Sequence, residues 1–248
     1  MKIATLNLRH NQDRWEDRFP LVVDTLSREQ ADVVGLQEVY LPIQQAQRIA
    51  EAVNAREPAR QYTVYVEPKW GPQPVEGVAL LSRLPILDQE RLELPEGERV
   101  AQRITVEVDG QRVHIANTHL HHRPIEDESI RLAQMQALLD WMFSRADSGW
   151  VLTGDMNALP ESTTIAAAEA RLNSAYFTLH RQHPITFPTP LVADRWEGPD
   201  LCIDYIFCDA ARLQVQEARM IADQGHADDP NLYPSDHFGL AAEVTIIA

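Results

Sequence analysis

The stretch Tyr233-Pro-Ser-Asp-His-Phe-Gly-Leu240 places a carboxylate beside an imidazole, at Asp236 and His237, immediately before an apolar run. The same association of polar side chains with apolar, β-rich runs recurs at Asn7, Glu38, His119, Asp155, Asn157 and Asp204. Because polar groups at strand ends can gather at one rim of a sheet, the pattern predicts a shared site. Carboxylates, amides and imidazoles together indicate a hard divalent cation and acid–base chemistry.

The order of these motifs resembles the endonuclease/exonuclease/phosphatase superfamily, which includes type I deoxyribonucleases, abasic-site endonucleases, neutral sphingomyelinases and inositol polyphosphate phosphatases. Each motif alone is weak, but together they span residues 3–240 in the family's order, as Asn7, Gln37-Glu38, Asn117-Thr-His119, Gly154-Asp-Met-Asn157, Asp204 and Ser235-Asp-His237. The resemblance implies an α/β (α+β) fold. It would be a type I deoxyribonuclease-like, four-layer sandwich of two packed mixed β-sheets flanked by helices.

Length and charge limit the organisation and the partners. With 248 residues, 44% hydrophobic and 24% charged, the chain is typical of a globular protein. Candidate site residues are scattered from one end to the other, which favours a single domain over residues 1–248. The net charge of −15 gives no long-range attraction to a polyanion, so a nucleic-acid partner is disfavoured.

Cysteine usage and hydropathy bear on location. Cys202 and Cys208 lie six residues apart in one expected strand, about 20 Å apart at the rise of a strand, so they cannot pair with each other. Two apolar thiols without a disulfide framework favour a reducing compartment. The N-terminus lacks a long apolar segment, and no apolar run reaches about 18 residues. We therefore expect a cytoplasmic protein with no stable membrane association, and the oligomeric state stays open.

Periodicity predicts an alternation of strands, helices and loops. The expected strands are 2–7, 32–37, 62–66, 77–82, 103–108, 112–118, 149–154, 202–208 and 240–247. The expected helices are 19–30, 42–55, 127–146 and 160–171, with Pro20 at the start of the first. Long connections are expected at 67–76, 120–128, 181–201 and 222–235. Such connections on a compact scaffold often carry specificity.

The resemblance implies a metal site. Glu38 would be the main metal ligand, Asp236 would reach the same ion, and Asn7 would lie beside it. Without the resemblance, Glu38 is equally consistent with a salt bridge at a strand end, and Asn7 with a turn. Because the ligands are hard oxygen donors, the expected ion is Mg²⁺ or Mn²⁺ rather than Zn²⁺.

The resemblance also implies catalytic roles. Asp155 would orient or activate the attacking water, and Asn157 would bind a non-bridging phosphate oxygen. His119 would donate to the phosphate or the leaving group. His237 and Asp204 would form an acid–base pair in which the carboxylate fixes the imidazole. The alternatives are an Asx-type turn at 155–157 and a solvent-facing Asp204.

Several other residues could surround this site. His121 is predicted to bind substrate, although an exposed loop histidine explains the same pattern. The residues for which local packing or a supporting role is the main expectation are Gln37, Arg83, Arg131, Gln134, Trp70, Trp196 and Phe187.

The sequence therefore predicts a metal-dependent phosphoesterase that uses an activated water for in-line attack. The acidic charge favours a small or lipid-derived phosphoester as substrate, either a diester or a monoester. One alternative is a DNA endonuclease or exonuclease of abasic-site or deoxyribonuclease type. Another is a non-catalytic binding protein on the same fold.

Overall fold

Two mixed sheets of six strands pack face to face in the computed structural model, which describes residues 1–122, 127–144 and 149–247. The first sheet has the strand order β11 (Leu213–Ile221), β12 (Gly239–Ile246), β1 (Lys2–Asn7), β2 (Val33–Tyr40), β4 (Glu76–Ser82) and β3 (Thr63–Pro68). The second has the order β5 (Asp88–Glu93), β6 (Val100–Val108), β7 (Gln111–His119), β8 (Gly149–Asp155), β10 (Asp204–Cys208) and β9 (Asn173–Ser174).

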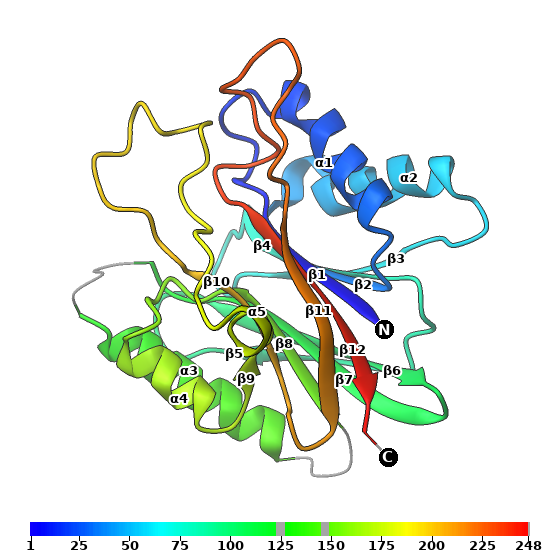
Figure 1. Ribbon diagram of the computed structural model, residues 1–248, viewed down its shortest axis with the longest axis vertical. Coiled ribbons are helices and arrows are strands. Elements are labelled where there is room, and N and C mark those ends of the chain that lie inside the picture. Colours follow the sequence, from blue (N-terminus) through cyan, green and yellow to red (C-terminus); the bar gives the residue numbers. More distant parts are fainter. Residues whose placement is uncertain (123–126, 145–148, 248) are drawn as a thin grey trace.

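Helices cover the outer face of each sheet (Figure 1). The first sheet packs against α1 (Trp15–Glu29) and α2 (Gln45–Arg56), and the second against α3 (Ser129–Phe143) and α4 (Thr163–Glu169). A short 3₁₀ helix (Leu41–Ile43) and α5 (Ala175–His180) complete the helical elements of the described residues. Two sheets between two helical layers confirm the predicted four-layer sandwich. None of the helices in the described ranges has the length and apolar character needed to span a bilayer.

The inner face of the sheets changes from apolar to polar along the central strands. Because side chains alternate across a strand, Ile3, Thr5 and Asn7 share one face of β1. Ile3 belongs to the apolar cluster between the sheets, whereas Thr5 accepts a hydrogen bond from Gln37 Nε2 at 3.0 Å. In β8 the same alternation takes Val151 into that cluster and leaves Asp155 at the strand end. The apolar layer therefore holds the sheets together, and the polar layer lies at one edge.

Each sheet has one parallel strand pair at its centre. Strands β1 and β2 run in parallel with Asn7 opposite Gln37, and β7 and β8 run in parallel with His119 opposite Asp155. The strands beside them are antiparallel, so β10 starts where β8 ends, with Asp204 opposite Asp155. Polar ends of four central strands consequently meet at one edge of the sandwich.

The predicted central strands are confirmed, with small differences at their ends. The expected strand 202–208 starts at Asp204, and both cysteines are free and buried, with Cys202 just before the strand. Sequence reasoning missed β5, β9 and β11, which lie at sheet edges and lack long apolar runs. It also missed α5.

The helix predictions are correct in type but shifted. Helix α1 begins at Trp15 rather than at residue 19, so Pro20 lies inside the helix and not at its start. Pro20 and Glu16 are both exposed, so the Glu16 carbonyl that loses its donor can bond to water. Helix α2 begins at Gln45, α4 spans Thr163–Glu169, and α3 ends at Phe143. Residues 123–126 of the predicted loop and 145–146 of the predicted helix lie outside the described residues.

Candidate active site

The first sheet brings Asn7 and Glu38 together. The register of β2 against β4 shifts between Leu36 and Val39, which marks a β-bulge, and Glu38 has a left-handed φ of 52°. Such a bulge re-aims a side chain that strict alternation would send toward the helices. Asn7 Nδ2 then lies 3.3 Å from Glu38 Oε1 and donates to Asp155 Oδ2 at 3.0 Å. The Asn7 amide therefore links carboxylates from the two sheets.

The second sheet brings Asp155 and His119 together. A side chain at Gly154 would place its Cβ 2.2 Å from the carbonyl oxygen of Thr118, so only glycine permits this close approach of β8 to β7. His119 Nε2 lies 3.6 Å from Asp155 Oδ2. Burial and the neighbouring Asp204 raise the pKa of Asp155 to about 7. Burial and the charge of Arg99 keep the pKa of His119 well below its usual value.

His237 and Asp204 form the expected pair. His237 Nδ1 donates to Asp204 Oδ2 at 2.9 Å, and both side chains are almost fully buried. This contact leaves Nε2 directed toward Asp155 Oδ2, at 4.0 Å. Burial lowers the pKa of His237, but the nearby Asp204 and Asp236 raise it more, to about 10. Asp204 therefore does not face solvent, and it fixes the orientation of a charged imidazole.

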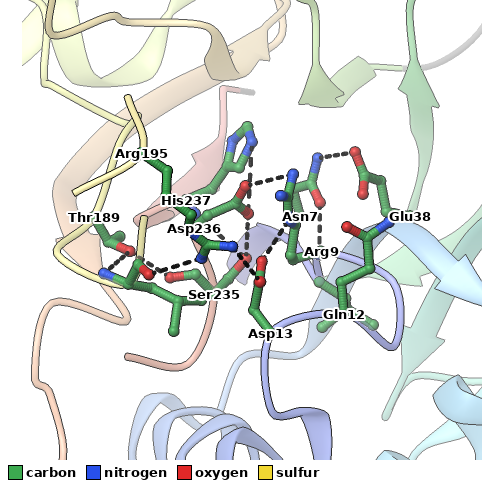
Figure 2. Close-up of polar contacts among 12 residues, drawn as sticks. Asn7, Arg9, Gln12, Asp13, Glu38, Thr189, Arg195, Ser235, Asp236 and His237 are labelled. Carbon is green, nitrogen blue, oxygen red and sulfur yellow. Dashed lines mark hydrogen bonds and ion pairs between the residues drawn. The ribbon is translucent and has the colours of Figure 1, made fainter. Parts of the chain in front are cut away.

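Asp236 contacts both His237 and Arg9 (Figure 2), and its Oδ1 lies 4.0 Å from His237 Nε2. Arg9 Nη1 lies 3.1 Å from Asp236 Oδ2, and Arg9 Nε donates to Asp13 Oδ2 at 2.9 Å. Burial and the charges of Asp236 and Glu76 raise the pKa of Glu38. A carboxylate whose pKa is raised by other carboxylates lies in a surplus of negative charge.

Sequence reasoning missed Glu76 and Arg99. Glu76 begins β4 and lies 2.6 Å from Lys69 Nζ and 3.7 Å from His119 Nδ1. His119 is thus held between two carboxylates, those of Glu76 and Asp155. Arg99 precedes β6 and is 4% exposed, with Nη2 3.1 Å from His122 Nδ1 and Nη1 3.8 Å from Glu76. Nη1 makes no hydrogen bond to any described residue, so a buried cationic donor stays available beside His119.

Asn157 and His121 are less closely tied to the cluster. The Asn157 backbone N–H donates to Asp155 Oδ1 at 2.9 Å, which is the Asx-type turn considered as an alternative. Its side chain is only partly buried and donates to the Leu120 carbonyl at 3.1 Å. His121 is also partly buried, and the contact that its backbone makes is a hydrogen bond to Gln134 Oε1. The structure therefore places both residues at the margin, and their roles stay predictions.

Aromatic side chains lie beside the site, and a hydrogen bond between the sheets lies beneath it. Phe187 lies with its ring centroid 5.0 Å from that of His237, and Trp196 packs edge-on against Phe187 at 4.9 Å. Trp70 lines a cavity of about 350 Å³ that borders Glu76. Gln37 Nε2 donates to Asn117 Oδ1 at 2.7 Å and so links the sheets beneath the site.

The supporting roles expected for Arg83, Arg131 and Gln134 agree with their positions. Arg83 lies at the far end of β4, where it pairs with Glu57 at 2.8 Å. Arg131 and Gln134 are buried on α3, and Gln134 Nε2 donates to the carbonyls of Pro95 and Glu96. None of the contacts described for these three residues reaches the carboxylate cluster.

The donor set suits a hard divalent cation. Glu38, Asp236 and Asn7 offer carboxylate and amide oxygens, which are the ligands that Mg²⁺ and Mn²⁺ prefer. Burial, together with the charges of Asp236 and Glu76, raises the pKa of Glu38, and a bound cation would offset this cost. Ligand atoms of Asp155, Asp204 and His237 also lie within 4.8 Å of one another. In that second group the hydrogen bond from His237 Nδ1 uses Asp204 Oδ2, and Asp204 Oδ1 has no hydrogen-bond partner among the described residues.

Comparisons with known proteins agree with this geometry. A family model described as the Endonuclease/Exonuclease/phosphatase family matches residues 4–237. A search of curated protein sequences gave no significant match. The human Nocturnin catalytic domain with bound sulfate is 24% identical, with 100% of this chain and 93% of that chain covered and a TM-score of 0.78.

Two further solved structures show the same fold. Humanized D. rerio TDP2 is 19% identical, with 99% of this chain and 98% of that chain covered and a TM-score of 0.80. The Bacteroides thetaiotaomicron mannosyl-6-phosphatase is 17% identical, with 99% of each chain covered and a TM-score of 0.77. At these identities the similarity is one of fold.

Proposed function

Because the chain belongs to the endonuclease/exonuclease/phosphatase family, we propose that it is a metal-dependent phosphoesterase acting on a phosphodiester or phosphomonoester. The proposal treats residues 1–248 as one catalytic domain. The observation that carries it is the continuous set of contacts from Glu38 through Asn7 to Asp155, which connects both sheets and ends 4.0 Å from His237 Nε2. Oxygen ligands and proton-transfer groups thus share one site.

Glu38, Asp236 and Asn7 would hold Mg²⁺ or Mn²⁺. When bound, the ion supplies Lewis-acid polarisation of the phosphoryl group and stabilises charge on the leaving oxygen. Arg9 balances the charge of Asp236 through an ion pair at 3.1 Å. The surplus of negative charge around Glu38 supports this assignment.

The proton-transfer groups belong mainly to the second sheet. Asp155 would accept a hydrogen bond from the attacking water and orient it for in-line attack. His237, held by Asp204, would donate from Nε2 to a phosphate oxygen or exchange a proton with the water. No covalent intermediate is required.

Other polar groups would bind the phosphate. His119 and Asn157 would stabilise charge on the equatorial oxygens, with His121 at the rim as a further substrate contact. Arg99 adds a buried guanidinium whose Nη1 has no hydrogen-bond partner among the described residues. Because a buried unpaired donor is costly, this nitrogen is well suited to bind a phosphate oxygen.

The net charge of −15 supports a small or lipid-derived phosphoester as substrate. The B. thetaiotaomicron structure is of a mannosyl-6-phosphatase, which is consistent with a small phosphomonoester.

A DNA endonuclease or exonuclease is the second candidate, because a D. rerio TDP2 structure that is 18% identical holds a single-strand DNA product. A non-catalytic binding role is disfavoured because the sequence contains every residue that the family resemblance implies for the site. The buried free thiols of Cys202 and Cys208 favour a cytoplasmic location.

Hydrolysis across a matched panel tests the proposal. The panel contains bis-p-nitrophenyl phosphate, p-nitrophenyl phosphate, supercoiled plasmid and an abasic-site duplex, each with Mg²⁺ or Mn²⁺ and with EDTA. His237→Ala is the test variant, and His180→Ala is its control because His180 lies on α5 and contacts the Ala218 carbonyl.

Turnover of small esters that requires metal and His237 would support the leading assignment. Nicking of plasmid or abasic DNA with the same requirements, and with a steep dependence on salt, would favour the nuclease. Full activity of His237→Ala or in EDTA would contradict the metal-dependent mechanism. Inactivity on every member of the panel would point to a specialised substrate or to a binding role.

A further inference from the structure

Arg18 is a buried cation without an ion-pair partner among the described residues. It lies in the first turns of α1 and is 0% exposed. Helical side chains point back toward the N-terminus, so the guanidinium reaches the loop that leads into the helix. Burial lowers the pKa of Arg18 to about 10, so it stays charged at neutral pH. Its nitrogens lie 2.6–3.5 Å from the backbone carbonyl oxygens of Leu8, Arg9, Gln12, Asp13 and Pro234.

The loop bound by Arg18 has a costly backbone. Arg9, His10, Asp13 and Arg14 all have φ between 49° and 61°, the left-handed region that residues with a side chain rarely adopt. A residue with a side chain is strained in this region, and it keeps such a conformation only when the surrounding structure fixes it. The hydrogen bonds from the Arg18 guanidinium to the carbonyls of this loop fix its left-handed backbone conformation.

The same guanidinium also holds the segment that carries the C-terminal site residues. Arg18 Nη1 donates to Leu8 at 3.0 Å and to Pro234 at 2.8 Å, so one nitrogen joins the loop after β1 to the segment before β12. Asp236 follows Pro234 by two residues and forms an ion pair with Arg9, which belongs to the loop after β1. Figure 2 shows Arg9 between Asp13 and Asp236. Both partners of the Arg9–Asp236 ion pair therefore rest on backbone that Arg18 holds.

We propose that Arg18 is a positioning residue that sets where Asp236 and His237 stand relative to Asn7 and Asp155. It touches none of the expected reacting atoms and acts through the two backbone segments. This side chain thus adds to the antiparallel pairing of β1 with β12 in fixing the separation of the residues from the two ends of the chain. This inference rests on the proposed function for its effect on turnover, but not for its effect on local structure.

The test compares Arg18→Ala with Arg83→Ala. Arg83 is a matched control because it is equally buried, with a side chain 1% exposed, and lies at the opposite end of β4 from Glu76. Two readouts are measured below the unfolding temperature of both variants. The first is kcat and KM on the best small ester, without and with millimolar methylguanidinium or urea. The second is hydrogen exchange in segments 8–14 and 233–238.

We expect kcat of Arg18→Ala to fall about 100-fold with a smaller change in KM, because a displacement of about 1 Å can have this effect. Methylguanidinium, which can replace the missing guanidinium, should raise the kcat of Arg18→Ala at least tenfold and reach a plateau. Urea, which has no charge, should not raise it. Exchange should accelerate in both segments. Arg83→Ala should keep its kcat and its exchange in these segments although it loses stability.

If Arg18→Ala does not fold, Arg18→Lys carries the same test, because lysine keeps the charge but offers three donors from one nitrogen instead of a planar fork. Unchanged exchange in both segments, or a kcat within threefold of the wild type, would overturn the proposal. A kcat that falls equally in Arg83→Ala would also overturn it. If the wild-type protein hydrolyses no ester, the proposed function fails, and the exchange comparison alone decides the role of Arg18.

Discussion

The two sheets build their halves of the site from the same strand arrangement but with different chemistry. In each sheet a central parallel pair ends at the site, β1 with β2 and β7 with β8. The first sheet contributes Asn7 and Glu38, which offer oxygen ligands in a surplus of negative charge. The second contributes His119, Asp155 and Asp204, which are buried, with His119 Nε2 3.6 Å from Asp155 Oδ2 and Asp204 opposite Asp155 in the sheet. Under the proposed function, one strand geometry presents oxygen ligands for a cation in the first sheet and proton-transfer groups in the second.

His237 joins the two halves. It lies just before β12 of the first sheet, yet its Nδ1 donates to Asp204 of the second. If the comparison is correct, removing a group of the second sheet should lower kcat in a way that added metal ion does not restore. Removing a group from the first half should damage cation binding, which a higher ion concentration can offset.

The largest effect is expected for Asp155→Asn. Removing this charge takes away the group that would orient the attacking water, so kcat should fall by about 10³-fold or more, and added Mg²⁺ or Mn²⁺ should not restore it. Asp209→Asn is the control, because Asp209 also accepts a backbone N–H two residues along but lies away from the site. Steady-state kinetics at several ion concentrations provides the measurement. Recovery of kcat at high Mg²⁺ would instead indicate that Asp155 helps to bind the cation.

A somewhat smaller effect is expected for Glu38→Gln. Loss of one carboxylate ligand should lower kcat/KM about 100-fold at low Mg²⁺, and a higher ion concentration should recover most of it. The activity is measured as a function of ion concentration in the variant and the wild type. A loss that no ion concentration reduces would show that Glu38 serves the chemical step directly.

The same variant gives a measurement that needs no substrate. In EDTA, Glu38→Gln should raise the thermal midpoint, because it removes a carboxylate that Asp236 and Glu76 repel. Adding Mg²⁺ should stabilise the wild type more than the variant, by linkage of ion binding to folding. Equal shifts with Mg²⁺ in both proteins would locate the ion elsewhere.

The polar layer beneath the site is expected to keep the two halves in register. Asn117 of the second sheet accepts from Gln37 and donates to the carbonyls of Leu36 and Ala79 in the first sheet. Asn117→Leu leaves these groups unsatisfied, so it should cost about 2–4 kcal/mol of stability in urea unfolding. It should also lower kcat, by about tenfold, because the halves lose part of their alignment.

The control for this change is Asn54→Leu. Asn54 bonds the backbone of Tyr62 through both side-chain atoms, remote from the interface between the sheets. It should lose stability without losing kcat. If Asn117→Leu behaved in the same way, the polar layer would serve stability alone.

The sequence predicted the centre of the fold and part of the site for a common reason. Central strands are buried on both faces and appear as apolar runs, so the polar residue after each run indicates the edge of the sheet. Edge strands such as β5 are polar and exposed, and they carry no such signal. The arrangement of two mixed sheets between helical layers came from the resemblance rather than from periodicity, and the strand orders were not predicted.

Glu76 and Arg99 were missed because they precede an apolar run instead of following one. Strands β4 and β6 are antiparallel to β2 and β7, so they begin at the edge where those strands end. The same geometry explains why Asp204 and Asp236 lie at or before strand starts. Arg9 gave no signal, because its position depends on left-handed backbone in the loop 8–14. A search for polar residues before apolar runs would have identified Glu76 and Arg99.

The smallest effect is expected for His121→Ala, at the margin of the second half. His121 is anchored by its backbone N–H to Gln134 Oε1, and this contact survives the substitution. A rim contact in water contributes little to transition-state stabilisation, so kcat should change less than about threefold, with any loss appearing in KM. His119→Ala, two residues earlier and 4% exposed, should by contrast lose kcat strongly. A loss of kcat in His121→Ala comparable to that of His119→Ala would extend the second half of the site into the loop that follows β7, and would make the histidine at the rim part of the chemical step.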